Sequence, residues 1–530
     1  MEVRMDSKNG TPVASPLEVI ETFLMQTQRN IIQWAEQLQE TPDRFTEIEE
    51  QIDQHFRQGG GQLVASLLAT TSEEPEMEEH VQELRQNAVV PLRAPQDRPL
   101  KVRLLCGLVI WITTAYCAPG RTKEVDPTEQ LAGLYPELAA FGFGKGCSPA
   151  LQYRVARIVA LSPSIEVARK ELRREGVVLD EKTVRRIAEQ MGLQLLELRR
   201  RELSAWREGW LPAGNDFANR RVAVQIDGGR VRLRENKKQK ANRRKKKGSR
   251  QKFDTPWREP KALIIFEFNE HGQMVKKERQ PLIDGTLLGP DHLAELVAFH
   301  LHRLGVAEAE LVVFISDGAR WIWDRLDWIE KRVGLDPSKT VQALDFCHAA
   351  HHISLALSHL GYTVAMRRKR YVELRRLLHR SRYDEVVSKL TERAKKQELP
   401  PDHDVWTEIR YLENHGAEGH LQYATFRRRG IPCGSGAIES TIRRVINQRL
   451  KSNATYWLEE NAEAVFAIRA LLLCDRWEET LPKVRQTMAR DRRIAWRWLA
   501  PDLTKLKPDE IISPPSAKTR ENQHQTTTAA

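Results

Sequence analysis

Apolar residues recur along the first part of the chain at the three- and four-residue spacing of an amphipathic helix. Within residues 15–60 turn-forming residues are scarce, and the apolar positions include Ile20, Phe23, Leu24, Ile31, Ile32 and Leu38. Residues 104–115 form a longer apolar stretch, which favours one or two strands. The pattern predicts a mostly helical, mixed region over residues 1–147, and it assigns no chemistry to residues 1–140.

Residues 148–192 carry three short apolar stripes at helical spacing. The first begins near Pro149, the dipeptide Ser162-Pro163 begins the second in the order that capping favours, and Asp180 can cap the third, which ends before Gly192. Three short helices in this order predict a helix-turn-helix unit over residues 148–210. Its third helix would expose basic side chains to phosphates and base edges in a DNA major groove, namely Lys182, Arg185 and Arg186. A plain helical hairpin with a solvated basic face is the alternative.

From residue 220 the pattern changes to an alternation of strands and helices. Buried-type strands are expected at residues 222–226, 261–268, 274–284, 310–316 and 340–345, and helices at about 291–304, after 317, and at 347–360. Three strands followed by helix, strand, helix and strand is the element order of an RNase H-like fold. We therefore expect the first part of such a core over residues 220–362.

The remaining sequence is expected to be largely helical. Residues 363–430 form a basic, all-α insertion, and a long amphipathic helix should follow the turn Gly434-Ser435-Gly436 within a second core segment, 431–500. Residues 501–530 are rich in Pro, Ser, Thr and Gln and predict a disordered tail. The fold class is thus an α/β multidomain protein.

The composition and net charge of the chain indicate which classes of protein it can belong to. The 530 residues are 41% hydrophobic and 29% charged, with no apolar run of the roughly 18 residues that a membrane span needs. The N-terminus has no apolar signal region, so we expect a cytoplasmic, nucleoid-associated protein. Six widely spaced cysteines support neither a disulfide framework nor a zinc ribbon. A net charge of +12 favours polyanionic partners.

Three carboxylates stand at positions suited to metal binding. Asp227 and Asp317 each follow an apolar strand and precede a glycine, and Glu439 begins the helix after the glycine turn. Carboxylates at strand ends lie on the rim of an α/β sheet, where ligands gather. Such a set suits two Mg²⁺ or Mn²⁺ ions, which can assist an in-line phosphoryl displacement. Taken singly, each residue also fits a plain turn or a favourable helix-dipole contact, so the hypothesis depends on all three together.

Three sequence blocks resemble a known family. LVVFISDGARWIW, VQALDFCHAAHHI and GIPCGSGAIESTIRRVINQRLK are similar to signature blocks of bacterial insertion-sequence transposases of the ISKra group, within the Mutator-like DDE superfamily, and the similarity covers residues 100–480. The resemblance implies DNA transposition by a catalytic triad that falls on Asp227, Asp317 and Glu439. It also implies a supporting pair after the second aspartate, matched here by Asp345 and His348.

The histidines near Asp345 also suggest a metal site. His348, His351 and His352 follow one another on a predicted helix, but no cysteine pair completes a zinc site, so we expect His348 to pack the helix instead. Many relatives carry a cysteine-rich zinc element before the helix-turn-helix. This sequence retains only Cys117 in that region, which puts metal binding there in doubt.

Two further basic segments could contact a DNA backbone. Residues 232–252 hold twelve Lys or Arg against one Glu, and they are either a solvated loop or a clamp beside Asp227. The helix after Glu439 carries candidate phosphate contacts that could equally form a solvated basic face: Arg443, Arg444, Arg449 and Lys451, with Gln448 among them.

The expected function is therefore metal-dependent phosphoryl transfer on DNA. A metal-activated water would cut at the ends of the element, and the freed 3′-hydroxyl would attack target DNA. The helix-turn-helix would bind terminal inverted repeats of double-stranded DNA, and the need to pair two ends implies a homodimer or a larger assembly. The alternatives are a domesticated DNA-binding regulator and an RNase H-like nuclease without strand transfer.

Overall fold

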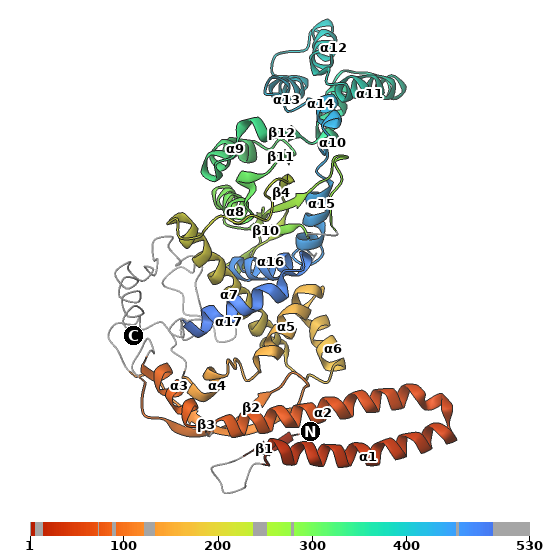
Figure 1. The fold of residues 1–530 in the computed structure, drawn as a ribbon. Helices are drawn as coiled ribbons and strands as arrows, with labels where there is room; N and C mark the ends of the chain where they lie inside the picture. Colours follow the sequence, from red (N-terminus) through yellow and green to blue (C-terminus); the bar gives the residue numbers. More distant parts are fainter. Residues whose placement is uncertain are drawn as a thin grey trace.

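The fold is mixed α/β and mostly helical, and its elements are arranged along one long axis (Figure 1). The computed structural model describes residues 2–5, 14–72, 74–86, 92–120, 133–236, 252–276, 280–451 and 455–490. The predicted C-terminal tail, 501–530, lies outside the described residues. In the described part, no helix is both long and apolar enough to cross a membrane.

The N-terminal region combines a long helical hairpin with a small sheet. Helices α1 (Pro16–Glu40) and α2 (Phe45–Ser72) pack against each other, and α3 (Pro75–Gln86) follows. The sheet has the order β1-β3-β2, formed by Glu2–Met5, Val109–Tyr116 and Gln96–Arg103. The predicted apolar stretch 104–115 is therefore a turn followed by most of one strand. Helix α4 (Pro136–Ala140) lies beside this sheet.

Three helices follow where the sequence predicts them. They are α5 (Pro149–Leu161), α6 (Ile165–Arg174) and α7 (Glu181–Arg207), and their apolar faces share one core. Asp180 caps α7 as expected, by accepting from the Thr183 N–H at 2.9 Å. The predicted cap of α6 is wrong. Ser164 caps that helix, whereas Ser162 ends α5 by donating its backbone N–H to the Ile158 carbonyl.

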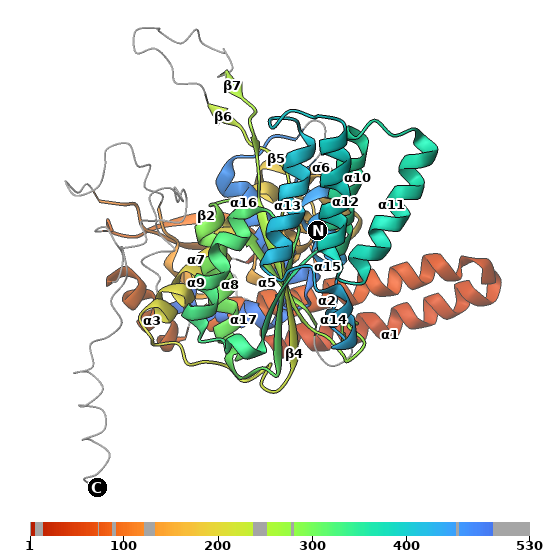
Figure 2. The same ribbon diagram turned by 90° about the horizontal axis from the view of Figure 1, so that it is seen from above.

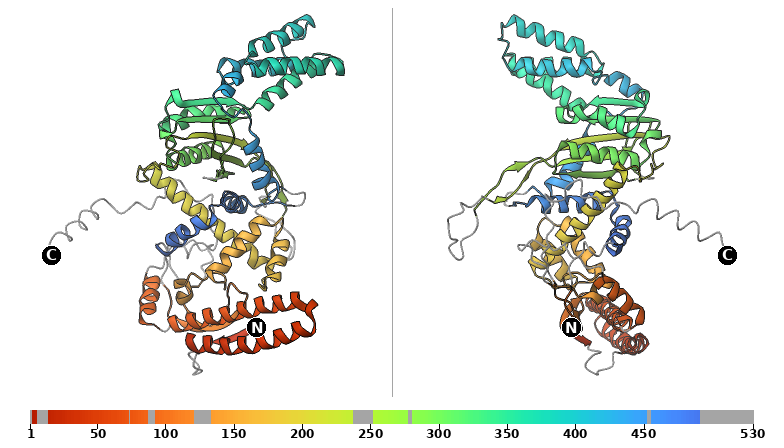
Figure 3. Two further views of the ribbon diagram at one scale, coloured as in Figure 1. Left: turned by 45° about the vertical axis from the view of Figure 1, so that its right-hand side comes forward. Right: turned by 90° about the vertical axis from the view of Figure 1, so that its left-hand side faces the viewer.

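Helix α7 does not stop at Gly192 as predicted but continues to Arg207. A Cβ at Gly192 would lie 2.4 Å from the Ala464 Cβ, so the glycine permits close contact with another helix and does not end its own. The first half of α7 packs in the three-helix core, and its last turns pack on the central sheet through Leu203 and Trp206. One continuous helix therefore joins the three-helix unit rigidly to the sheet (Figure 3).

The centre of the molecule is a five-stranded mixed sheet with the order β10-β9-β4-β11-β12. Its strands are β4 (Arg221–Gly228), β9 (Lys261–Glu267), β10 (Leu282–Thr286), β11 (Leu311–Ser316) and β12 (Thr340–Leu344). The first three pair antiparallel, and β4, β11 and β12 are parallel. The third strand is Leu282–Thr286 and so begins later than the predicted 274–284, although Met274 forms an isolated bridge with Phe268.

Both faces of this sheet are buried, which explains its nearly continuous apolar strands. Side chains alternate between faces along a strand. On one face, Val222, Val224 and Ile226 pack with α7, α8 (Pro290–Arg303) and α9 (Arg320–Val333). On the other, Ala223 and its neighbours pack with α10 (Phe346–His359), α15 (Gly436–Ile442) and α16 (Glu459–Leu473).

After β4 the chain leaves the central sheet and forms two short antiparallel strand pairs. They pair β5 (Val231–Arg232) with β8 (Trp257–Arg258), and β6 (Glu235–Asn236) with β7 (Phe253–Asp254). Figure 2 shows β6 and β7 reaching away from the body of the protein. Most of the predicted basic segment 232–252 lies outside the described residues. Short 3₁₀ turns elsewhere span Pro42–Arg44, Val306–Glu308 and Pro337–Lys339.

The segment between α10 and the glycine turn is helical, as predicted for residues 363–430. It consists of α11 (Val364–His379), α12 (Tyr383–Lys396), α13 (Val405–Ala417) and α14 (Tyr423–Arg428), and α13 packs along α10 (Figure 2).

The predicted long helix after the glycine turn is interrupted. Helix α15 passes into a π-helical turn at Arg443–Asn447, and the chain then loops to α16 and α17 (Trp477–Arg490). The buried guanidinium of Arg469 explains the interruption, because it donates to the Val445 carbonyl at 2.9 Å and also to the Arg444 carbonyl. Carbonyls that an α-helix would pair within itself are paired here with a side chain.

Candidate active site

Three aspartates lie in one row at the carboxyl ends of the three parallel strands. Strand pairing places Ile315 level with Gln225, and Ser316 level with Leu344. Two residues beyond the first pair, and one beyond the second, the same register places Asp317 level with both Asp227 and Asp345. The order of the parallel strands therefore gathers carboxylates that are 90 and 28 residues apart in the sequence.

The surroundings of Asp227 oppose its ionisation. Its Oδ1 accepts from the Gly228 N–H at 2.6 Å, and its side chain is only partly exposed. Burial, and next the charge of Asp317, raise the pKa of Asp227 to about 6, and Glu439 adds to the effect. An aspartate so close to other carboxylates is costly to ionise unless a cation shares the site.

The loop that carries Asp317 is fixed from two sides. Asp317 Oδ1 accepts from the Ala319 N–H at 3.0 Å, and the Asp317 carbonyl accepts from the Tyr411 hydroxyl at 2.7 Å. Gly318 has a φ of +85°, and a Cβ there would lie 2.0 Å from the Tyr411 oxygen. Both the backbone conformation and the close approach of Tyr411 therefore require glycine at this position.

Asp345 caps helix α10 and is almost completely buried. Its Oδ1 accepts from the His348 N–H at 2.7 Å and lies 3.2 Å from His348 Nδ1, while Oδ2 accepts from the Ser435 N–H at 2.5 Å. Burial opposes ionisation of Asp345, but these hydrogen bonds outweigh it and hold the pKa below its usual range. The hydrogen bond to Asp345 in turn raises the pKa of His348. The predicted packing role of His348 is wrong, because its half-exposed ring pairs with Asp345.

Glu439 joins this row from helix α15, which packs against β4 and β9. It lies in the first turn of α15, where its Oε1 accepts from the Ser435 hydroxyl at 3.0 Å. One ligand atom each from Asp345, His348 and Glu439 lies within 4.8 Å of the others. Ser435 therefore links two acidic residues, through its N–H to Asp345 and through its hydroxyl to Glu439.

The donor set fits hard divalent cations. Asp227, Asp317 and Glu439 supply carboxylate oxygens, and among the described residues no cation forms an ion pair with any of the three. The mutual repulsion that raises the pKa of Asp227 is the repulsion that a divalent cation would remove. Oxygen ligands with remaining positions for water are typical of Mg²⁺.

Gln225 is a site residue that the sequence analysis did not single out. It is 1% exposed within β4, where its Nε2 donates to the Gly434 carbonyl at 2.9 Å and its Oε1 accepts from the Ile438 N–H at 3.0 Å. Both bonds hold the start of α15, and hence Glu439, against the strand that carries Asp227. The available signal was one glutamine inside the otherwise apolar strand VAVQI.

Replacing Gln225 by leucine is expected to destabilise the protein by about 1–3 kcal/mol, because the buried Ile438 N–H and the partly buried Gly434 carbonyl would lose their partner. Urea unfolding measures this change. Gln194→Leu is a matched control, since Gln194 is 2% exposed and its Oε1 has no hydrogen-bond partner. Equal losses of stability in both variants would contradict the positioning role of Gln225.

Most of the side chains predicted to contact DNA are exposed. On α7, Lys182, Arg185 and Arg186 are exposed, as are Arg443 and Lys451 after Glu439, whereas Arg444 is half-buried. These residues are available to a ligand, and their contact with DNA stays a prediction.

The prediction for Arg449 is wrong. Arg449 is 4% exposed, donates from Nε to the Val159 carbonyl at 3.2 Å, and lies over the Trp457 ring. Burial and the nearby Arg469 lower the pKa of Arg449 to about 10. This side chain joins the end of α5 to the segment after α15, and it cannot reach a ligand.

Comparisons with known proteins identify no relative. No protein-family model matches the chain, and neither a curated protein nor a solved structure resembles it significantly.

Proposed function

We propose that this protein is a DNA transposase with an RNase H-like core that cuts and joins DNA with two divalent metal ions. The observation that carries the proposal is the row of Asp227, Asp317 and Asp345 with Glu439 beside it, at one end of the central sheet. The sheet order β10-β9-β4-β11-β12, with only the first pairings antiparallel, suits an RNase H-like core.

The carboxylates of the chain would act by holding the metal ions in fixed positions. Asp227 and Asp317 would flank the two metals, and Glu439 would complete the second site. Bound metals would supply Lewis-acid activation of the attacking oxygen and stabilisation of the leaving oxygen. Asp345 would act as a positioning residue, since both of its oxygens already accept hydrogen bonds from His348 and Ser435. His348, whose pKa is raised, could offer a positive charge to a DNA phosphate.

Recognition of terminal inverted repeats would fall to the three-helix unit. The exposed side chains Lys182, Arg185 and Arg186 lie in the first turns of α7, where a recognition helix contacts DNA. Because α7 continues to the central sheet, DNA held by its first turns would keep a fixed orientation to the carboxylates.

The double variant Arg185→Ala/Arg186→Ala is expected to bind element-end DNA more weakly and with a shallower salt dependence. The slope of log affinity against log salt should fall by about 2 if both side chains neutralise phosphates. Fluorescence anisotropy at several salt concentrations measures both quantities. Lys395→Ala/Lys396→Ala removes the same charge from exposed positions on α12 and controls for net charge. An identical slope in the two double variants would count against recognition by α7.

Transposition brings two DNA ends together, so a homodimer or larger assembly belongs to the proposal. The α1–α2 hairpin exposes several large apolar side chains that could support contact between copies, among them Leu17, Leu24, Ile31, Ile32 and Phe56.

The test is incubation of the purified chain with linear DNA that carries the ends of its element, a target plasmid and Mg²⁺ or Mn²⁺. We expect cleavage at the element ends and joining of the 3′ ends to the plasmid. Cleavage without joining would replace the proposal by an RNase H-like nuclease. Specific binding without cleavage in either metal would replace it by a DNA-binding regulator.

A further inference from the structure

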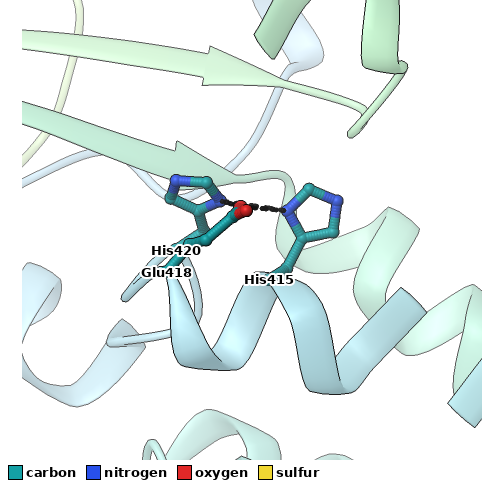
Figure 4. Close-up of side chains that lie close together, drawn as sticks. All are labelled: His415, Glu418 and His420. Atoms are coloured by element: carbon teal, nitrogen blue, oxygen red, sulfur yellow. Dashed lines mark hydrogen bonds and ion pairs between the residues drawn. The ribbon is translucent and has the colours of Figure 1, made fainter. Parts of the chain in front are cut away.

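A second cluster of potential metal ligands lies away from the carboxylate row, at the end of helix α13. His415 is in the last turn of α13, Glu418 caps that helix, and His420 follows in the turn (Figure 4). Their side chains point toward one another. His415 Nδ1 and His420 Nδ1 are 3.0 Å apart, and Glu418 Oε2 lies 3.3 Å from His420 Nδ1 and 3.8 Å from His415 Nδ1.

These separations match the spacing of ligands around a tetrahedral ion. Ligands at about 2.0–2.1 Å from a Zn²⁺ ion stand roughly 3.3–3.4 Å from each other. The three measured separations lie on both sides of that value. Small side-chain rotations would therefore place the three atoms around one ion, with no change to the backbone.

The hydrogen bonds around His420 leave its Nδ1 without a proton. Gln342 donates from Nε2 to Glu330 Oε1 at 2.8 Å, which turns its Oε1 toward His420 Nε2 at 3.3 Å. That oxygen can only accept, so His420 carries its proton on Nε2 and directs the lone pair of Nδ1 at His415 Nδ1 and Glu418 Oε2. A partner that fixes the far nitrogen of a histidine in this way is typical of metal sites.

Without a cation the three ligand atoms share at most one proton, carried by His415 Nδ1, which can be donated to His420 Nδ1 at 3.0 Å. The Glu418 carboxylate beside them then has no proton to accept from either ring atom. Both rings are nearly buried, with His415 8% and His420 5% exposed. Burial, and in second place a neighbouring histidine, lower the pKa of each to about 4.

The geometry points to a zinc-type site formed by His415, Glu418 and His420, with water as the fourth ligand on the solvent side. Two imidazoles and a carboxylate favour a borderline cation such as Zn²⁺ over Mg²⁺. Glu418 is exposed, which gives an ion a path from solvent.

The site would fix the helical insertion to the edge of the central sheet. Residues that flank it already bond β12, because the His420 carbonyl accepts from the Leu344 N–H at 3.1 Å and the Tyr423 hydroxyl donates to the Leu344 carbonyl at 3.1 Å. Trp323 of α9 stacks on the His420 ring at 4.1 Å. An ion there would join α13, the following turn and the strand edge next to the loop of Asp317.

The experiment is Zn²⁺ titration of the metal-stripped full chain, followed by measurement of bound zinc and of the melting temperature. The carboxylate row can also take Zn²⁺, and so can Asp345 and His348 together with Glu439, so the titration is made in an Asp227→Asn/Asp317→Asn/Glu439→Gln background. We expect one bound Zn²⁺ per chain, a higher melting temperature with zinc, and a tetrahedral absorption spectrum when Co²⁺ replaces it.

Glu418→Gln and His420→Gln should each weaken Zn²⁺ binding by at least about 10-fold, since changes even to outer partners of a metal ligand have effects of that size. His359→Gln is the matched control, because His359 lies at the end of α10, outside the cluster, with its ring against His403. If His420→Gln does not fold, Glu418→Gln decides, because its side chain is 60% exposed. Absence of bound zinc, or equal affinity in Glu418→Gln and His359→Gln, would overturn the site.

Discussion

Asp317→Asn is expected to lower metal-dependent DNA cleavage by at least about 10³-fold while DNA binding is retained. The amide keeps the size of the side chain but loses its charge, so it is a weaker ligand for a divalent cation. Removal of one group that stabilises transition-state charge commonly lowers rates by about 10²–10³-fold, and loss of a residue that acts within a catalytic unit lowers them further. Single-turnover cleavage of end DNA, with anisotropy for binding, measures both properties.

Asp327→Asn is the matched control for this variant. Asp327 is an exposed aspartate on α9, ten residues after Asp317, so its replacement makes the same change of charge outside the row. Cleavage by the control should equal that of the wild type. Retention of cleavage in Asp317→Asn would remove Asp317 from the metal site, and loss of DNA binding in that variant would show a role other than the proposed one.

Arg199→Leu is expected to destabilise the folded protein by about 3–5 kcal/mol, the range found when a buried ion pair loses one partner. Arg199 lies on α7, nearly buried, with Asp284 of β10 at 3.0 Å and Glu463 of α16 at 2.7 Å. It also donates to the Gly285 carbonyl at 2.9 Å. Its removal leaves two buried carboxylates without their cation, at the point where α7, the sheet and α16 meet.

Urea unfolding at neutral pH measures the effect of Arg199→Leu. Arg174→Leu serves as a control, since Arg174 pairs with Glu171 on the exposed face of α6 and surface pairs contribute little. A loss in Arg199→Leu no larger than that in the control would show that the buried network does not hold these elements together.

The difference in stability between wild type and Arg199→Leu should also depend on pH. Burial opposes ionisation of Asp284, but Arg199, and after it His300, outweigh it and hold the pKa of Asp284 far below its usual range. A depressed pKa contributes stability above the unfolded value of about 3.9, and this contribution is lost as pH falls through the folded pKa. The advantage of the wild type should therefore be full at neutral pH and shrink below about pH 4.

The strand-end aspartates could be predicted from the sequence because the pattern is local. A buried strand shows as a short apolar run, and Asp227, Asp317 and Asp345 each come at the end of one. Their alignment in one row depends on the strand order and register, which no single segment contains. Gln225 could have been suspected as the one polar residue within the apolar run VAVQI, but its partners at Gly434 and Ile438 are more than 200 residues away.

The errors of sequence interpretation come from contacts between distant segments. Glycine is common just after a helix end, so Gly192 predicts that α7 stops there. In the structure Gly192 lies within α7, where the lack of a side chain allows close packing against Ala464 of α16. Arg449 sits in a basic cluster typical of DNA contacts, yet the Val159 carbonyl, 290 residues earlier, holds its side chain inside the protein. Neither contact can be inferred from the local pattern of hydrophobic and polar residues.

The most direct measurement is anomalous diffraction from crystals of the protein with Mn²⁺, which locates bound ions independently of any DNA substrate. The proposal predicts two Mn²⁺ ions about 3.5–4 Å apart, in contact with Asp227, Asp317 and Glu439. Crystals that hold no ion at these carboxylates, or an ion bound by Asp345 and His348 without Asp227 and Asp317, would contradict it.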